Sequence, residues 1–462
     1  MAAAPQVSYR RAALIARVRS PRTRPDFVVE VFLLFEIACQ LALAFTALGA
    51  ARVVVRIAAF TASLLLLLAI LPPRGRSHPA GRWVVLVLLI VGLGIFHPST
   101  NGWVPGIAQA ALYLAIVAPL FWVPRSPIDS ATLRRAILII WTFESVSASV
   151  GVLQFYFPGR LEPNLSSVVA AVGNAYVRDL HFAAADGRWI IRPMGLTDVP
   201  GGAAVAGLYT VLLGTGLFLS ERRVWMRLAC AASMSVGMVC VYLCQVGSIL
   251  AVLVISQLAF AVILMWRGQK VKSTIMAVLV AAVVLGSFYW AVAVGGDDAL
   301  SRVEAFRQSP GDVYLKKRGR FLTETIQDLL PQYPLGAGLG RWGMTSHYFG
   351  DRANPDSSAI WVEIQWTGWL LDGGLPLIVA YVAAFAVTFQ ATLKIALSRD
   401  SGDLWLWGAM LCGYDTGVLA NTFAYPVFIG QGGLEFWLLN ALLWAAASQT
   451  VRYPNRFRLL RS

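Results

Sequence analysis

Charged residues are scarce in this sequence. Asp, Glu, Lys and Arg make up 13% of its 462 residues, whereas 58% of the residues are hydrophobic. A soluble domain usually carries about twice that share of charge. This scarcity argues against an ordinary soluble domain.

Cysteine is rare as well. The five cysteines all lie in long apolar stretches: Cys39, Cys230, Cys240, Cys244 and Cys412. Their spacing contains no CxxC pair, so it gives neither a disulfide framework in the loops nor the usual metal-ligand pattern. We therefore expect no metal site, and nothing in the sequence indicates a cofactor.

Apolar runs of membrane-spanning length, in contrast, recur from one end of the chain to the other. Lipid offers no hydrogen-bond partners, so such runs cross a bilayer as helices. The sequence predicts an all-α, polytopic integral membrane protein of about 12 transmembrane helices. The expected spans are 27–48, 53–71, 83–96, 104–123, 133–157, 199–219, 224–244, 248–266, 273–294, 374–397, 404–423 and 434–448.

The net charge of +14 is unevenly placed along the chain. If the N-terminus lies in the cytoplasm, most Lys and Arg residues fall in cytoplasmic segments, as the positive-inside rule requires. The short turns on the other side, 97–103 and 424–433, contain neither Lys nor Arg. We expect basic cytoplasmic tails at 1–26 and 449–462 around a single membrane domain at 27–448. Tails of this kind contact anionic lipid, and we prefer that interpretation to nucleic-acid binding.

Two loops are long, and both are expected on the outer side, at about 158–198 and 295–373. Long loops with their own pattern usually carry function. Within the second, apolar residues recur at helical spacing from Asp312 to Leu330, which predicts an amphipathic helix that ends at Pro331. A short half-helix at 359–366 and a break at 372–374 are expected before the next span.

Three short motifs give the sequence a family likeness. The first reads IRPMGL from Ile191 and continues DVPG from Asp198; the second reads PLGAGLG from Pro334; the third reads GWLLDGGLP from Gly368. In their order, spacing and shared outer location they resemble the O-antigen ligase/polymerase superfamily, the membrane glycosyltransferases that use undecaprenyl-diphosphate-linked glycans.

The sequence departs from that family at two places. Family ligases carry a His where Glu363 stands here, and they often carry a Ser-Arg pair where this chain reads Gln245 to Ser248 without the Arg. The missing His favours a polymerase over a lipid-A ligase.

The resemblance implies a location, a reaction and partners. It places the protein in the bacterial inner membrane, where it would move a glycan from its undecaprenyl-diphosphate carrier to a sugar hydroxyl at the outer face, in O-antigen or exopolysaccharide assembly. Flippase and chain-length regulator proteins would be its partners, besides the bilayer itself.

Such a reaction requires groups that bind a diphosphate, and arginine binds phosphate oxygens with two parallel hydrogen bonds. Arg192 is the first candidate, although an arginine at a bilayer boundary also serves simply as an interfacial contact. Arg341 follows a glycine-rich turn whose backbone amides could approach an anion. Arg320 lies with Lys316, Lys317 and Arg318 on the amphipathic helix, where these side chains could bind phosphate or anionic headgroups, although such a charged face is more often a solvated surface.

The reaction also requires a base for the acceptor hydroxyl. Glu363 is the first candidate because it lies in an apolar stretch, Asp372 is the second, and His347 is the third. Trp342 and Trp361 are candidates for stacking on sugar rings, and the same residue type also gathers at bilayer interfaces.

Ionisable residues inside the spans are costly and face a partner or a cavity. We expect Glu36 and Arg56 to form a structural pair, and Glu144 and Asp415 to line a proton or substrate path.

Two other functions stay open. A secondary transporter also has about twelve spans, but it predicts repeat symmetry and short outer loops, which this sequence lacks. A non-catalytic subunit of a polysaccharide export assembly is the third alternative.

Overall fold

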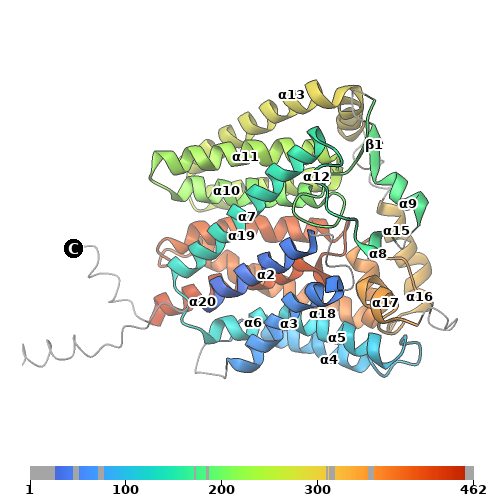
Figure 1. Cartoon of the computed structure of the whole chain (residues 1–462). Helices are drawn as coiled ribbons and strands as arrows, with labels where there is room; N and C mark the ends of the chain where they lie inside the picture. The colour runs from blue at the N-terminus through green and yellow to red at the C-terminus, as the bar shows by residue number, and fades with distance from the viewer. Residues whose placement is uncertain are drawn as a thin grey trace, which may run out of the picture.

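The computed structural model describes residues 27–44, 51–70, 77–170, 173–183, 187–308, 311, 318–351 and 358–452, and this part of the chain is mainly helical (Figure 1). Each expected span coincides with a helix. The helices concerned are α2 (Val28–Ala44), α3 (Arg52–Ala69), α4 (Gly81–Gly94), α5 (Trp103–Val117) with α6 (Pro119–Trp122), α7 (Ser130–Tyr156), α10 (Gly202–Ser220), α11 (Val224–Cys244), α12 (Gly247–Trp266), α13 (Lys270–Gln308), α18 (Gln365–Leu397), α19 (Leu404–Asn421) and α20 (Gln431–Arg452).

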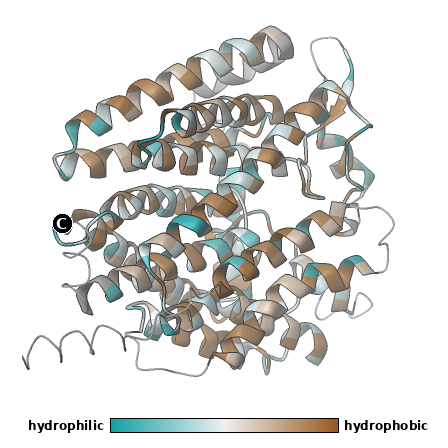
Figure 2. Ribbon diagram, turned by 60° about the vertical axis from the view of Figure 1, so that its left-hand side comes forward, coloured by the Kyte–Doolittle hydropathy of each residue, from teal (hydrophilic) through white to brown (hydrophobic). Residues whose placement is uncertain are grey.

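Within the described residues, seven helices are long and apolar enough to cross a membrane, or eight if the bent segment of α5 and α6, which turns by 41°, is one span. Their surfaces are apolar too: Leu68 on α3 and Leu285 on α13 are among many exposed large hydrophobic side chains. Hydrophobic residues run along the helices of the bundle (Figure 2). The prediction of a helical membrane protein is therefore confirmed at this level, since such surfaces suit lipid.

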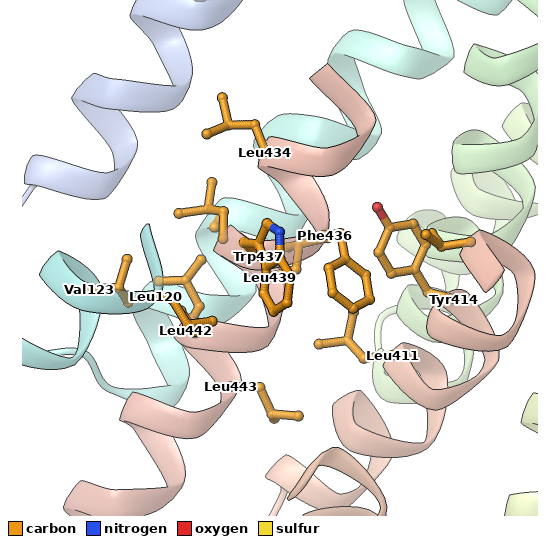
Figure 3. Close-up of a cluster of buried hydrophobic side chains, with 14 of the residues drawn as sticks. Leu120, Val123, Leu411, Tyr414, Leu434, Phe436, Trp437, Leu439, Leu442 and Leu443 are labelled. Atoms are coloured by element: carbon orange, nitrogen blue, oxygen red, sulfur yellow. The ribbon is translucent and has the colours of Figure 1, made fainter. Parts of the chain in front are cut away.

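The helix α10 lies inside the bundle and packs along α7 and α11. Small residues allow this close packing. A Cβ atom added at Gly207 would lie 2.6 Å from the backbone oxygen of Gly237 on α11. Small residues of this kind are the usual means by which membrane helices approach each other. A second part of the core joins α6, α19 and α20, where Leu120, Tyr414 and Trp437 pack together (Figure 3).

The first long loop forms small elements of its own. These are α8 (Ser167–Ala170), α9 (Asn174–Asp179) and an antiparallel hairpin of β1 (His181–Ala183) and β2 (Trp189–Ile191). They gather at one end of the bundle with the elements of the second long loop (Figure 1). We call this end the loop end.

The second long loop differs from the prediction in two ways. Helix α13 continues as far as Gln308, well beyond the expected end of its span. The amphipathic helix is present in its described part as α15 (Arg320–Glu324), a π-helical turn at Thr325–Leu329 and α16 (Leu330–Gln332). Pro331 therefore lies in its last turn instead of ending it. Residues 312–317, with Lys316 and Lys317, lie outside the described residues, as do the tails at 1–26 and 453–462.

The expected half-helix is present before the break, but it begins at Gln365 and not at Ala359, so it leaves Glu363 outside. Residues 358–363 form no regular helix, Ile364 is extended, and α18 begins only at Gln365. The expected break is present, because Gly373 and Gly374 have non-helical backbone angles inside α18. A Cβ atom at Gly374, where φ is +66°, would lie 2.2 Å from the backbone oxygen of Pro334. The break thus exists where the glycine-rich turn packs against α18.

Candidate functional site

The segment that carries Arg192 is fixed to the bundle by α7. The side chain of Gln154 accepts hydrogen bonds from the backbone amides of Met194 and Gly195, both at 2.8 Å. At Gly195 φ is +66°, and a Cβ atom there would lie 2.6 Å from the hydroxyl oxygen of Ser147. Only glycine fits this close approach. The anchored segment therefore holds Arg192 at a set position at the loop end of α7.

Two arginines near the start of α3 share one carboxylate in the same loop. Arg52 donates to Asp198 at 2.8 Å, and Arg56 pairs with the same carboxylate. Arg52 also bonds the backbone oxygen of Asn164 at 3.1 Å, and Arg56 bonds the hydroxyl of Ser166 at 3.3 Å. Because two guanidinium groups meet a single carboxylate, this pairing leaves one positive charge in excess.

The expected pair of Glu36 and Arg56 is therefore wrong. Glu36 instead lies near Gln431 and Glu435 of α20. The reason is depth in the bundle. Arg56 is one turn from the start of α3, whereas Glu36 lies at the middle of α2, about 12 Å from either end of that helix.

The other expected interior acids are also buried among polar partners. Glu144 lies within electrostatic reach of Glu435. Asp415 accepts a hydrogen bond from Asn440 at 2.9 Å, and Asn440 accepts one from Thr392 at 2.7 Å. These groups connect α7, α18, α19 and α20 inside the bundle.

Glu363 forms an ion pair with Arg318 at the loop end. The indole N–H of Trp361 donates to the other carboxylate oxygen of Glu363 at 2.9 Å. The side chain of Glu363 is 13% exposed. Both oxygens are thus oriented by donors from two separate segments of the second long loop.

Tyr176 on α9 connects Glu363 with Arg192. Its ring packs edge-on against Trp361, with ring centroids 5.4 Å apart. Burial raises the pKa of Tyr176, and the positive charges of Arg318 and Arg192 oppose that effect. The phenol is therefore protonated at neutral pH and can donate a hydrogen bond. Since Arg192 and Arg318 both lie within electrostatic reach of Tyr176, the first candidate base and the first candidate phosphate ligand lie in the same part of the loop end.

Tyr425 links this group to α3, because its hydroxyl interacts electrostatically with Arg56, Asp198 and Arg318. The site as a whole contains four arginines, two carboxylates and three aromatic side chains. We call it the arginine cluster: Arg52, Arg56, Arg192, Arg318, Asp198, Glu363, Tyr176, Tyr425 and Trp361.

The glycine-rich turn is not part of the arginine cluster. Its Gly338 lies against the backbone of the turn at Ser99 and Thr100. A Cβ atom at Gly338 would lie 2.5 Å from the backbone nitrogen of Thr100. Arg341 is buried, and its guanidinium donates to the backbone oxygens of Ala337 at 3.1 Å and Ser358 at 3.3 Å. The turn thus approaches another turn of the chain closely, and Arg341 ties it to the segment that leads to Glu363.

Asp372 is an anchor in the same region. Its carboxylate accepts hydrogen bonds from Gln109 at 3.0 Å, Tyr113 at 2.6 Å and the indole of Trp342 at 2.9 Å. Asp372 is 1% exposed, and Trp342 is equally buried. The network joins α5, the glycine-rich turn and α18 through neutral donors.

The remaining candidates lie at the surface of the loop end. Arg320 is exposed and lies over the ring of Phe321, 4.7 Å from its centroid. His347 on α17 (Gly343–Phe349) packs against Tyr348, with ring centroids 4.8 Å apart. These two ring contacts do not involve the arginine cluster, but Arg320 lies within electrostatic reach of Arg318. In the described ranges, no group of three or more His, Cys, Asp or Glu residues is arranged to hold a metal ion.

Sequence reasoning missed several residues of the site: Arg52, Asp198, Tyr176, Arg318 as the partner of Glu363, and Tyr425. One signal was available. Arg52 and Arg56 are four residues apart at the start of an apolar helix, so both lie on one face at the membrane boundary. No protein family model matches the chain, and the curated proteins contain no match to it.

Proposed function

We propose that the protein is a membrane glycosyltransferase that transfers a glycan from an undecaprenyl-diphosphate carrier to a sugar hydroxyl. The observation that supports this most is that Arg192 and Arg318, the ion-pair partner of Glu363, both lie within electrostatic reach of Tyr176. These residues come from two loops that are far apart in the sequence. The family resemblance of the motifs supports the same reaction.

The cations of the cluster suit the donor. A lipid diphosphate is dianionic or more highly charged, and guanidinium groups bind its oxygens and remain charged. Arg192 and Arg318 both lie within electrostatic reach of Tyr176, whose protonated hydroxyl adds a neutral hydrogen-bond donor. In this proposal the three groups hold the diphosphate and stabilise its charge as it leaves.

Glu363 serves as the base. It accepts the proton of the acceptor hydroxyl, whose oxygen attacks the anomeric carbon of the donor sugar. The bond between that carbon and the phosphate oxygen breaks, and undecaprenyl diphosphate leaves with its electron pair. Trp361 and Arg318 fix the carboxylate of Glu363 in place, which is the orientation that proton transfer requires.

The proposed setting follows the charge pattern of the sequence. All twelve helical segments cross the bacterial inner membrane, both termini are cytoplasmic, and the loop end faces outward. The absence of the family His at the position of Glu363 makes a polymerase our preferred form of the enzyme. A flippase and a chain-length regulator are its proposed partners.

The test uses purified full-length protein in nanodiscs with an undecaprenyl-diphosphate oligosaccharide. We expect chain extension, and loss of extension in Arg192→Ala. Arg178→Ala is the matched control, because Arg178 is an exposed arginine of the same loop on α9. Absence of extension with wild-type protein, or equal extension by both variants, would contradict the proposal. The first of these outcomes would favour a non-catalytic export subunit.

A secondary transporter is the alternative, and the buried carboxyl groups Glu36, Glu144, Asp415 and Glu435 favour it. Acids inside a helix bundle are typical of proton-coupled carriers. Proton-coupled sugar uptake in proteoliposomes that survives Arg192→Ala and is lost in Asp415→Asn would support the transporter over the enzyme.

A further inference from the structure

The arginine cluster has an aromatic side in addition to its cationic one. Trp361 is 48% exposed, although it lies in an extended loop segment and not on a lipid-facing helix. Tyr176 packs against it, and Tyr425, which is also exposed, interacts with Tyr176. We call these three side chains the aromatic shelf: Tyr176, Trp361 and Tyr425.

The ring of Trp361 is held at two points. Its N–H is bonded to Glu363, and the ring of Tyr176 meets it at 72°. A large side chain that is fixed before binding loses little conformational entropy when a ligand packs on it. A fixed and partly exposed aromatic side chain next to a carboxylate is a feature of a binding site.

An interfacial role accounts for this geometry poorly. At a bilayer interface, the polar edge of an indole reaches the wet headgroup region. Here the N–H of Trp361 donates to a carboxylate of the protein itself, and that carboxylate pairs with Arg318. The indole N–H is therefore bonded within the site and does not face a lipid headgroup.

The chemistry of the shelf selects a neutral sugar. An aromatic face carries partial negative charge, so it attracts the weakly positive C–H groups on the face of a pyranose ring. The hydroxyl groups at the edge of such a ring need hydrogen-bond acceptors nearby, and Glu363 is one. A diphosphate would be drawn to the arginines instead.

We propose that the aromatic shelf is the acceptor subsite, in which the terminal sugar of the acceptor glycan stacks on Trp361 and directs its attacking hydroxyl to Glu363. This inference rests on the proposed glycosyl transfer. It gives the site a cationic side for the lipid-linked donor and an aromatic side for the acceptor, and Tyr176 contributes to both.

Three variants test the shelf. Trp361→Ala removes the ring, Trp361→Phe keeps a ring but removes the N–H, and Trp225→Ala removes an exposed tryptophan at the opposite end of the bundle as a control. We expect Trp361→Ala to raise the acceptor KM about tenfold, the loss of one aromatic contact. Trp361→Phe should change it less than about threefold, and the donor KM should stay unchanged in all three.

The KM and kcat values separate stacking from positioning. If Trp361 only positioned Glu363, then kcat would fall by the same factor in Trp361→Ala and Trp361→Phe, with the acceptor KM unchanged. That result would overturn the acceptor subsite while leaving the glycosyl-transfer proposal standing.

Binding is measured separately from catalysis. The probe is the oligosaccharide freed from the lipid-linked donor by mild acid, and saturation-transfer NMR reports its contact with the protein. Binding that is weakened in Trp361→Ala and kept in Trp225→Ala supports the shelf, even if no transfer occurs. Undetectable binding to the wild type, or equal binding to all variants, overturns the shelf.

Discussion

Glu363 and Asp372 lie on either side of the start of α18, and their surroundings differ in kind. Asp372 is fully buried and accepts hydrogen bonds from three neutral donors, two on α5 and the third at Trp342, directly after the glycine-rich turn. Glu363 is partly exposed and meets a guanidinium group and an indole. A carboxylate enclosed by neutral donors holds helices together, whereas one at the edge of a cationic site can meet a substrate.

The two arginines Arg192 and Arg341 differ in the same way. The guanidinium group of Arg341 donates hydrogen bonds to the backbone oxygens of Ala337 and Ser358. Arg192 lies within electrostatic reach of Tyr176 in a site that other arginines share. Residue type and a nearby glycine motif therefore do not distinguish these two candidate phosphate ligands, whereas their neighbours do.

The largest effect is expected when the charge of each of the two acids is removed in turn. We expect Glu363→Gln to lower the rate of chain extension about 10²- to 10⁴-fold, the usual contribution of a general base. Asp372→Asn should retain extension per folded molecule. Rates normalised to folded protein by size-exclusion chromatography check this. Similar losses in the two variants would show that the carboxylates do not differ in role.

The second prediction concerns stability. Asp372→Ala leaves the donors Gln109, Tyr113 and Trp342 without their acceptor, which should destabilise the fold by about 3 kcal/mol. Glu363→Ala should cost less than about 1 kcal/mol, because its ion pair with Arg318 is partly exposed. Thermal unfolding in detergent measures both, and an equal fall in Tm would remove the distinction.

The arginines give a third test. Arg192→Lys keeps the charge but loses the planar fork, and we expect about a tenfold loss in kcat/KM for the lipid-linked donor. Arg341→Lys should leave kcat/KM within about twofold and lower Tm instead, because its partners are carbonyl oxygens. A larger kinetic loss for Arg341→Lys would reverse our assignment of these residues.

The smallest expected effect is at Tyr176. Tyr176→Phe removes one hydrogen-bond donor, so we expect a loss of about three- to tenfold in kcat/KM. Burial raises the pKa of Tyr176 above its usual value of about 10. The phenol thus stays protonated as the pH rises to about 9, and wild type and variant should share one pH profile up to that point. An alkaline loss below pH 9 that is absent from Tyr176→Phe would contradict this.

Parts of the site were predictable from local sequence. The sequence places Arg192 at the end of the first long loop, directly before an apolar helix. The break at Gly373 and Gly374 follows from two adjacent glycines in an apolar run. The segment of Glu363 was mistaken for a helix because it is apolar. It forms no regular helix, and its backbone bonds to the end of the glycine-rich turn, where the amide of Ile360 donates to the oxygen of Arg341 at 2.8 Å.

The positions of most helices follow from the apolar runs of the sequence, because a long apolar run can satisfy its backbone polar groups only within itself. The tertiary structure determines which charged side chains form ion pairs. Arg56 faces Asp198 and not Glu36, and Arg318 faces Glu363, because loops far apart in the chain pack over the same end of the bundle. Such pairs depend on the orientation and depth of each helix, and neither quantity is fixed by the residues of one segment alone.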